Sequence, residues 1–219
     1  MSGPIINPVA NQLADDISVQ NNSRNWNFTK KSLKILKTKL ENHKPMTNSV
    51  AVVSVWLGDD LLHNLKETFR WLRLRLKADE LKLICNLDLK DISFRNGYKK
   101  TDDPVLEVRN LRFIPTSFLL WTPTTVNPFQ NRSDRRMPGL EGIQYVIENL
   151  PQVLNELKGD ALAFPGLSVG GNSMPVLFQK DDEVFVELYV PGMDIGRPVW
   201  VCIFVEPGPI TSYSKEAKS

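Results

Sequence analysis

The stretch from residue 50 to residue 89 most constrains the fold, because it predicts a strand, a helix and a second strand in close succession. Residues 50–57 are a β-branched apolar run that ends at Gly58, and residues 81–89 alternate apolar and polar side chains; both patterns are typical of strands. Between them, apolar side chains recur at steps of three and four, which places them on one helical stripe. They are Leu61, Leu65, Phe69, Leu72 and Leu76. Burial contributes roughly 1.5–3 kcal/mol per side chain, so we expect this helix to pack against the sheet in a βαβ unit.

The second half of the chain predicts more strands and a second long helix. Residues 105–114 and 118–121 have the composition of strands. Residues 143–157 have helical periodicity, and we expect Pro151 to kink or restart this helix and Gly159 to end it.

The strongest strand signal lies near the end of the chain. Residues 184–190 and 199–205 flank a loop rich in Pro and Gly, which predicts an antiparallel hairpin. The second of these strands is apolar on both faces, so we expect it to be central in the sheet or covered on both sides. Residues 160–175 predict an irregular segment. The expected fold class is α+β, a single domain whose mixed or antiparallel β-sheet is covered on one face by two main helices.

The expected domain organisation follows from composition. A chain of 219 residues can bury a substantial core as one domain, which we place at residues 46–206. Residues 1–45 predict a mobile N-terminal tail, polar and Asn-rich over 1–25, that carries a basic amphipathic segment. Residues 207–219 predict a flexible C-terminal end.

The expected location is intracellular. The chain has no apolar run of about 18 residues or more, and its first residues lack the basic and apolar regions of a signal peptide. Cys85 and Cys202 lie in apolar strand-like runs, which favours buried, reduced thiols. A net charge of +2 argues against a protein that coats nucleic acid over its whole surface, so contact with a polyanion must be local.

The basic segment, residues 24–44, is the first candidate site. Leu33, Leu36 and Leu40 share one helical face, and a single acid, Glu41, interrupts the lysines. Two interpretations stay open: attachment to phospholipid headgroups or nucleic-acid phosphates, and a solvated lysine face on a helix that docks its leucines on the core. The candidate contacts are Lys30, Lys31, Lys34, Lys37, Lys39 and Lys44.

Two further groups of arginines are candidate secondary contacts. One lies on the predicted helix of residues 61–76, where arginines can hold phosphates or can form the solvated side of a core helix. The other lies in residues 122–138, a long stretch rich in Pro, Asn and Arg of the kind that is usually functional or disordered. The candidates are Arg70, Arg73, Arg75, Arg132, Arg135 and Arg136.

No motif predicts catalysis, a metal or a cofactor. His43 and His63 are the whole histidine inventory, too few for a metal site or a histidine-dependent nucleophile. Adjacent acids in loops usually cap helices or form solvated turns. They occur here as Asp59 and Asp60, Asp102 and Asp103, and Asp181 and Asp182. We therefore expect a protein that is not an enzyme.

The C-terminal strands resemble those of rhabdovirus matrix proteins, in particular the lyssavirus-like ones. The similarity lies in residues 181–188 and 196–203 and in the order of elements from residue 50 onward, chiefly residues 50–89 and 181–205. The resemblance implies a virion protein of the host cytoplasm that self-associates, binds the inner leaflet through basic N-terminal residues, condenses the nucleocapsid and supports budding. The proline motifs for budding that this family often carries, PPxY and P-T/S-A-P, do not occur here.

Two functions of different classes therefore stay open. The first is a non-enzymatic, matrix-like structural protein that forms homo-oligomers and binds acidic membrane lipids peripherally, with the nucleocapsid or RNA as a further partner. The second is a nucleic-acid-binding viral effector, such as a coat protein, silencing suppressor or movement protein, that uses the same basic segments. Salt dependence of RNA binding separates the two, because phosphate neutralisation makes affinity fall steeply with salt.

Overall fold

The structure, a computed structural model, describes residues 15, 17–19, 21–22, 28–43, 50–56, 61–94, 105–115 and 138–205. Its helices are α2 (Lys30–Asn42), α3 (Leu61–Ala78), α5 (Leu140–Glu148) and α6 (Leu150–Leu157). Its strands are β1 (Val50–Trp56), β2 (Lys82–Cys85), β3 (Ser93–Phe94), β4 (Val105–Pro115), β5 (Ala161–Ala163), β6 (Leu167–Ser168), β7 (Met174–Lys180), β8 (Glu183–Tyr189) and β9 (Val199–Val205).

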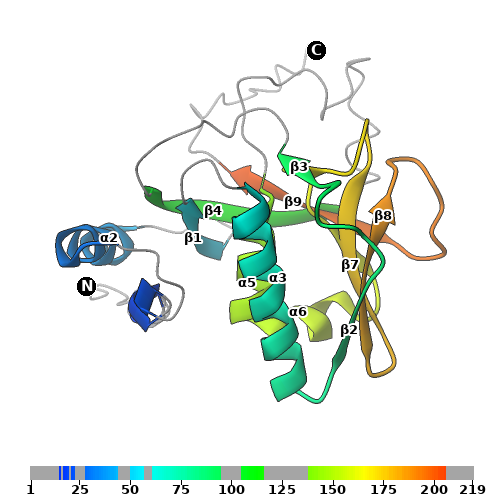
Figure 1. Cartoon of the computed structure of the whole chain (residues 1–219), viewed down its shortest axis with the longest axis horizontal. Helices are drawn as coiled ribbons and strands as arrows, with labels where there is room; N and C mark the ends of the chain where they lie inside the picture. The colour runs from blue at the N-terminus through cyan, green and yellow to red at the C-terminus, as the bar shows by residue number, and fades with distance from the viewer. Residues whose placement is uncertain are drawn as a thin grey trace, which may run out of the picture.

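Seven of the described strands form one mixed sheet in the order β1-β4-β9-β5-β7-β8-β2, and β3 pairs with β6 beside it. The neighbours β2 and β8, and β5 and β9, are parallel, and the other neighbours are antiparallel. The sheet twists strongly, so that β4 and β9 run across the view in Figure 1 while β7 and β8 run down it. The predicted α+β class with a mixed sheet is confirmed.

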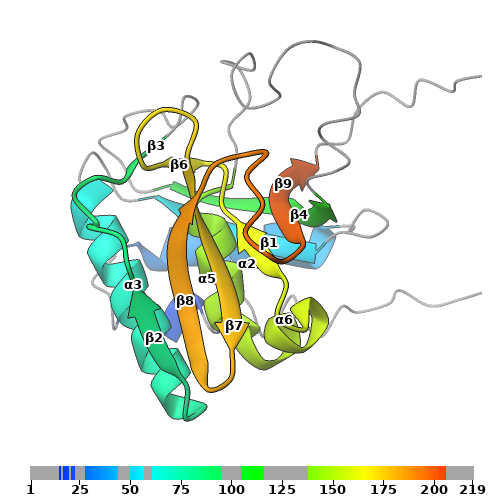
Figure 2. The same cartoon turned by 90° about the vertical axis from the view of Figure 1, so that its right-hand side faces the viewer.

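The two strands of the predicted βαβ unit lie at opposite edges of this sheet. β1 pairs with β4 at one end, and β2 pairs with β8 at the other. The chain of pairings makes β1 and β2 parallel, with five strands between them. The helix that connects them, α3, packs on α5 and on β2 (Figure 2). The local sequence pattern was sufficient to predict the elements but not their neighbours.

The predicted hairpin of residues 184–190 and 199–205 is wrong. β8 pairs instead with β7, through a tight turn in which Asp181 adopts a positive φ of 55°. β9 lies between β4 and β5, and its predicted central position is confirmed. Residues 160–175, expected to be irregular, contain β5, β6 and the start of β7. Strand pairing depends on contacts between distant segments, and these carry no local signal.

Helix α5 forms the centre of the main core. Every residue from Leu140 to Ile147 is buried, since α5 lies between the sheet and α3. Gly142 permits this close approach: a Cβ there would lie 2.7 Å from Cδ1 of Phe164 and 3.3 Å from Sγ of Cys202. The predicted second helix does restart at Pro151, in the first turn of α6, and ends as expected before Gly159.

The sheet is also covered on its opposite face, which the sequence did not indicate. On β4, Leu111 and Phe113 face the core with α3 and α5, whereas Val108 faces α2 together with Val53 of β1. Helix α2 therefore packs on the second face, at the β1–β4 end, and stands apart from α3 in Figure 1.

Farther along the second face, a third cluster gathers apolar side chains of β5, β7, β8 and β9. The loop between β8 and β9 folds over it, and the Arg197 guanidinium lies 3.9 Å from the centre of the Phe178 ring. The Arg197 Nη1 also donates to the Gly159 carbonyl oxygen at 2.8 Å. These contacts explain why the loop is held in place over the sheet.

Several predictions on the ends and loops lie outside the described residues, in whole or in part. The short strand at 118–121, residues 122–137 of the long loop, and the flexible end at 207–219 are all outside. Within the predicted mobile segment 1–25, the described residues are helical and Ile17 is fully buried. Ile17 packs with the leucines of α2.

Candidate anionic-surface site

Helix α2 is capped at both ends by its own polar residues. The Thr29 hydroxyl oxygen accepts a hydrogen bond from the Ser32 backbone N–H at 3.1 Å, which is a standard N-cap. At the other end, Asn42 Nδ2 donates to the Thr38 carbonyl at 2.8 Å, and the His43 backbone N–H donates to Leu40. The helix therefore begins and ends where its sequence specifies.

The leucine face of α2 is docked on the domain. Leu36 and Leu40 are each 2% exposed, in a cluster with Ile17, Phe28 and Val53. The predicted interpretation of leucines docked on the core is thus confirmed for these two, and Leu33 is half-buried against the same cluster.

Hydrogen bonds hold the chain in place just before and just after α2. Asn21, itself buried, accepts from the Phe28 backbone N–H at 2.9 Å and donates to the Phe28 carbonyl at 3.2 Å. His43 Nε2 donates to Asn110 Oδ1 on β4 at 2.8 Å. Since Asn110 is buried in the sheet, this bond ties the C-terminal end of α2 to the domain.

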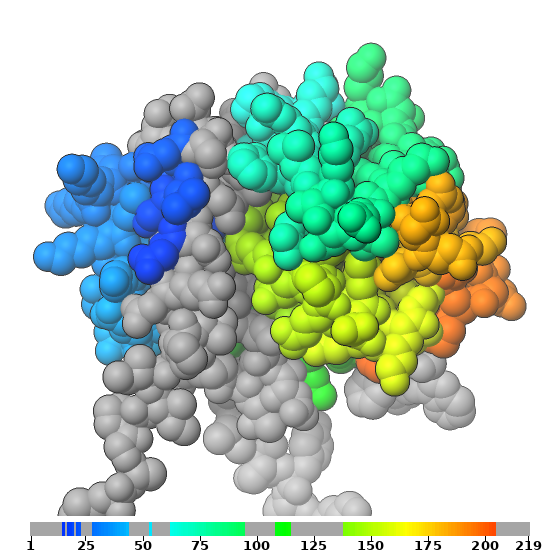
Figure 3. All heavy atoms as spheres, turned by 90° about the horizontal axis from the view of Figure 1, so that it is seen from below, coloured from blue at the N-terminus to red at the C-terminus, as the bar shows by residue number. Residues whose placement is uncertain are grey.

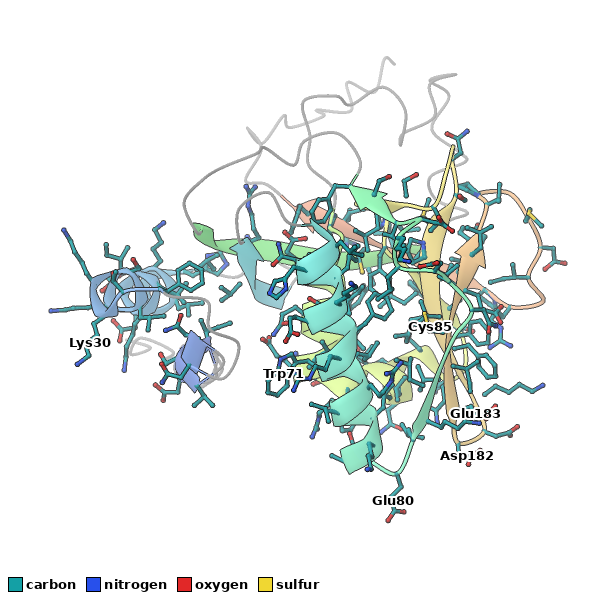
Figure 4. The ribbon with its side chains drawn as sticks, viewed as in Figure 1. Lys30, Trp71, Glu80, Cys85, Asp182 and Glu183 are labelled. Carbon is teal, nitrogen blue, oxygen red and sulfur yellow. The ribbon has the colours of Figure 1, made fainter. Side chains whose placement is uncertain are left out.

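The five described lysines of the basic segment, Lys30, Lys31, Lys34, Lys37 and Lys39, are all exposed. No salt bridge in the described part of the chain involves them. In Figure 4, Lys30 points away from the body of the molecule, and Figure 3 shows α2, in blue, protruding at one side. The described lysines thus form an exposed cationic surface on α2.

The lysines surround the solvent side of the helix. At about 100° per residue, Lys30 and Lys37 lie at one border of the leucine face, on the side that carries Glu41, and Lys39 lies at the other border, about 60° from Leu36. Lys31 lies opposite the leucines. Lys31 and Lys39 are each one turn from Ile35. Ile35 is 50% exposed. Ile35 was not predicted from the sequence, although its position off the leucine stripe was a usable signal.

The position of the first two lysines is unfavourable for the helix itself. Lys30 and Lys31 occupy the first turn, which holds no acidic residue. The N-terminus of a helix carries partial positive charge, so cations there are destabilising by about 0.3–1 kcal/mol each. Helix stability therefore does not explain why these two residues are lysines.

The basic residues of α3 form a different surface. Lys66, Arg70, Arg73 and Lys77 share one exposed stripe along the helix. Arg75 lies on another side, 3.6 Å from a carboxylate oxygen of Asp79. The structure thus groups Arg70 with Arg73 but separates Arg75 from both.

Ion pairs on α3 also reduce its free charge. Arg70 lies 3.6 Å from Glu67. The remaining residues predicted from the sequence as candidate contacts lie outside the described residues: Lys44, Arg132, Arg135 and Arg136.

The described His, Cys, Asp and Glu side chains form no metal-binding cluster, since no group of three or more of them is placed to hold a metal ion. Cys202 is buried, and burial raises the pKa of its thiol well above the usual value, which makes it unreactive. Asp181 and Asp182 form the predicted solvated turn, whose carbonyls accept from Gln179 and Lys82.

No helix among the described residues combines the length and apolar character needed to cross a bilayer.

Comparison with known proteins finds no relative of this chain. No protein-family model, curated protein or solved structure matches this chain.

Proposed function

We propose that this chain is a non-enzymatic structural protein, similar in role to a viral matrix protein, that self-associates and binds an anionic membrane surface peripherally. The observation that carries the proposal is the lysine face of α2, exposed and outside every described salt bridge while the opposite face is docked. A docked basic helix presents its charges to phospholipid headgroups without first having to fold. The expected location is the inner face of a membrane in the host cytoplasm, or the virion.

Self-association follows from the strength of such a contact. The five lysines of α2 less Glu41 leave four net charges. Each cation near an acidic leaflet contributes about 1 kcal/mol, so the charges of a single copy contribute at most about 4 kcal/mol, equivalent on their own to a Kd near 1 mM. An assembly of copies raises the effective affinity by about 10²–10⁴ without any new contact. Stable attachment therefore requires an oligomer.

Co-sedimentation with liposomes tests the proposal. We expect the wild-type chain to bind vesicles that contain acidic lipid and not neutral ones. A variant with Lys30, Lys31, Lys34, Lys37 and Lys39 changed to Glu should lose this binding. Binding that ignores acidic lipid, from a protein that also stays monomeric at all concentrations in sedimentation velocity, would contradict the proposal.

The basic stripe of α3 supports nucleic-acid binding as a second candidate function. Lys66, Arg70, Arg73 and Lys77 extend over about 16 Å of helix, and arginine binds phosphate with a planar pair of donors. In this case RNA affinity should fall steeply with salt, and changing Lys66 and Arg73 to Gln should reduce the log–log slope by about 2. A protein that does not bind RNA even at low salt excludes this candidate.

A further inference from the structure

Ile35 is the one large apolar side chain of α2 that the domain does not bury. It is 50% exposed, whereas Leu36 and Leu40 are each 2% exposed. On the helix it lies about 100° from Leu36 and 140° from Leu40, and so faces away from the cluster that docks α2. Its position is therefore not explained by packing.

The neighbours of Ile35 on the helix surface are cationic and polar. Lys31 and Lys39 precede and follow it by one turn, and both are exposed. Thr38, three residues on, is also exposed, and Glu41 lies about 120° away on the far side of Lys34. The result is a short row, Lys31–Ile35–Lys39, in which an aliphatic side chain lies between two cations.

From this geometry we propose that the row is a bilayer-insertion surface. Ile35 enters the interface between headgroups, while Lys31 and Lys39 contact the lipid phosphates on either side of it. The inference rests on the proposed function and names its partner as a fluid acidic bilayer. Insertion of Ile35 supplies a part of the affinity that salt does not screen, because transfer of apolar surface does not depend on charge.

The chemistry of isoleucine favours a lipid over a nucleic acid. An aliphatic side chain has no ring to stack on a base and no group to hydrogen-bond a phosphate, so it adds nothing to a phosphate contact. At a bilayer it gains the free energy of leaving water, as interfacial helices with lysines on one face and apolar residues nearby do.

A second exposed aliphatic residue belongs to the same unit. Val19 is 67% exposed, and its neighbour Ile17 is buried in the cluster that docks α2. The other large apolar residues that are exposed in the described part of the chain, Leu74, Leu188 and Met193, lie elsewhere on the domain. Helix α2 and the described residues 17–19 beside it thus combine the exposed lysines with two exposed aliphatic side chains, Ile35 and Val19.

Flotation with acidic vesicles at low salt and at about 1 M salt, where the Debye length is about 3 Å, tests the inference. We expect Ile35→Ser to bind about fivefold more weakly at high salt, since about half of an isoleucine side chain no longer leaves water. Ile35→Trp should bind more tightly, because tryptophan favours the interface. Leu74→Ser, which removes an equally exposed side chain from α3, is the matched control and should leave binding unchanged.

The outcomes separate this inference from the proposed function. Acidic-vesicle binding that Ile35→Ser and Ile35→Trp both leave unchanged at high salt overturns the inference alone. An equal loss in Leu74→Ser overturns it as well. No acidic-vesicle binding by the wild-type chain overturns the proposed function and the inference together. Circular dichroism of each variant checks that α2 remains helical.

Discussion

Helices α2 and α3 are both basic and amphipathic, but they are attached to the domain in different ways. α3 buries four large side chains, Leu65, Phe69, Leu72 and Leu76, in the main core beside α5. α2 docks through two leucines on a small cluster at the edge of the opposite face. Figures 1 and 3 show the resulting separation of the two helices.

Their charges differ as much as their packing. On α3, Arg70 and Arg75 lie beside Glu67 and Asp79, as expected for the solvated side of a core helix. On α2, the described lysines form no salt bridge with described residues, and two of them oppose the helix dipole. Two of the five basic residues of α3 are therefore paired, whereas the described lysines of α2 are all outside the described salt bridges. That difference is the physical reason to propose the partner surface on α2.

The largest expected effect is a loss of stability on truncating a leucine of the main core, compared with a leucine of the cluster that docks α2. Leu72→Ala should lower the free energy of unfolding of the domain by about 2–5 kcal/mol, because Leu72 is fully buried and its removal leaves a cavity. Leu40→Ala should instead release α2 locally, which hydrogen exchange detects as faster exchange confined to α2. An equal decrease in the free energy of global unfolding in both variants would show that α2 unfolds together with α3 and not locally.

A smaller loss is expected where α5 meets the sheet. Gly142→Ala places a methyl group 2.7 Å from Phe164, and such overpacking costs about 1–3 kcal/mol. Alanine recovers about 1 kcal/mol of helix propensity, so a net loss of about 1 kcal/mol should remain in chemical denaturation. Gln152→Ala, on the exposed side of α6, is the control and should stay within about 0.5 kcal/mol. A stabilised Gly142→Ala variant would mean that the main core is looser than the structure indicates.

The burial of Tyr145 in the main core should make the stability of the domain depend on pH in the alkaline range. Burial, followed by the negative charge of Glu156, raises the pKa of Tyr145 to about 12. In the unfolded chain this phenol ionises near pH 10, so the folded state retains the proton more tightly. Stability from this residue is present below about pH 10 and is lost as the pH rises toward 12. Denaturation curves at increasing pH should show this loss, and Tyr145→Phe should remove it.

The smallest expected effect comes from reversing the charges in the first turn of α2, which should stabilise the helix and weaken membrane binding. Lys30→Glu with Lys31→Glu should stabilise α2 by about 0.3–1 kcal/mol per residue, since acids favour a helix N-terminus. The same double variant should bind acidic vesicles more weakly. Hydrogen exchange of α2 and flotation measure the two quantities on one sample. A variant in which both quantities fall would indicate that the lysines support the helix itself.

The sequence predicted local elements better than their neighbours. The stripes of Leu65 and Leu72 on α3, and of Leu36 and Leu40 on α2, were identified from spacing alone, because helix periodicity is local. The pairing of β8 with β7 was missed, since Pro175 and the preceding Gly170 and Gly171 obscured the strand. The separation of β1 and β2 to opposite edges has no local signal.

The candidate site was predicted in part. The five described lysines of α2 were named from the sequence and are all exposed. The orientation of α2 depends on Val53, Val108 and Asn110 of the sheet, and no spacing within α2 specifies these partners. Ile35 acquires its significance only from that orientation, because the same residue would be buried if α2 docked on another face.

The central claim, that α2 rather than α3 presents the anionic-surface contact, is tested most directly by two charge-matched variants on the same acidic vesicles. One changes Lys31, Lys34 and Lys39 to Glu, and the other changes Lys66, Arg73 and Lys77 to Glu. All six positions are exposed, and the two variants change the net charge equally. Loss of vesicle binding in the α2 variant with retention in the α3 variant is the predicted result. Equal loss in both, or a greater loss in the α3 variant, would contradict it.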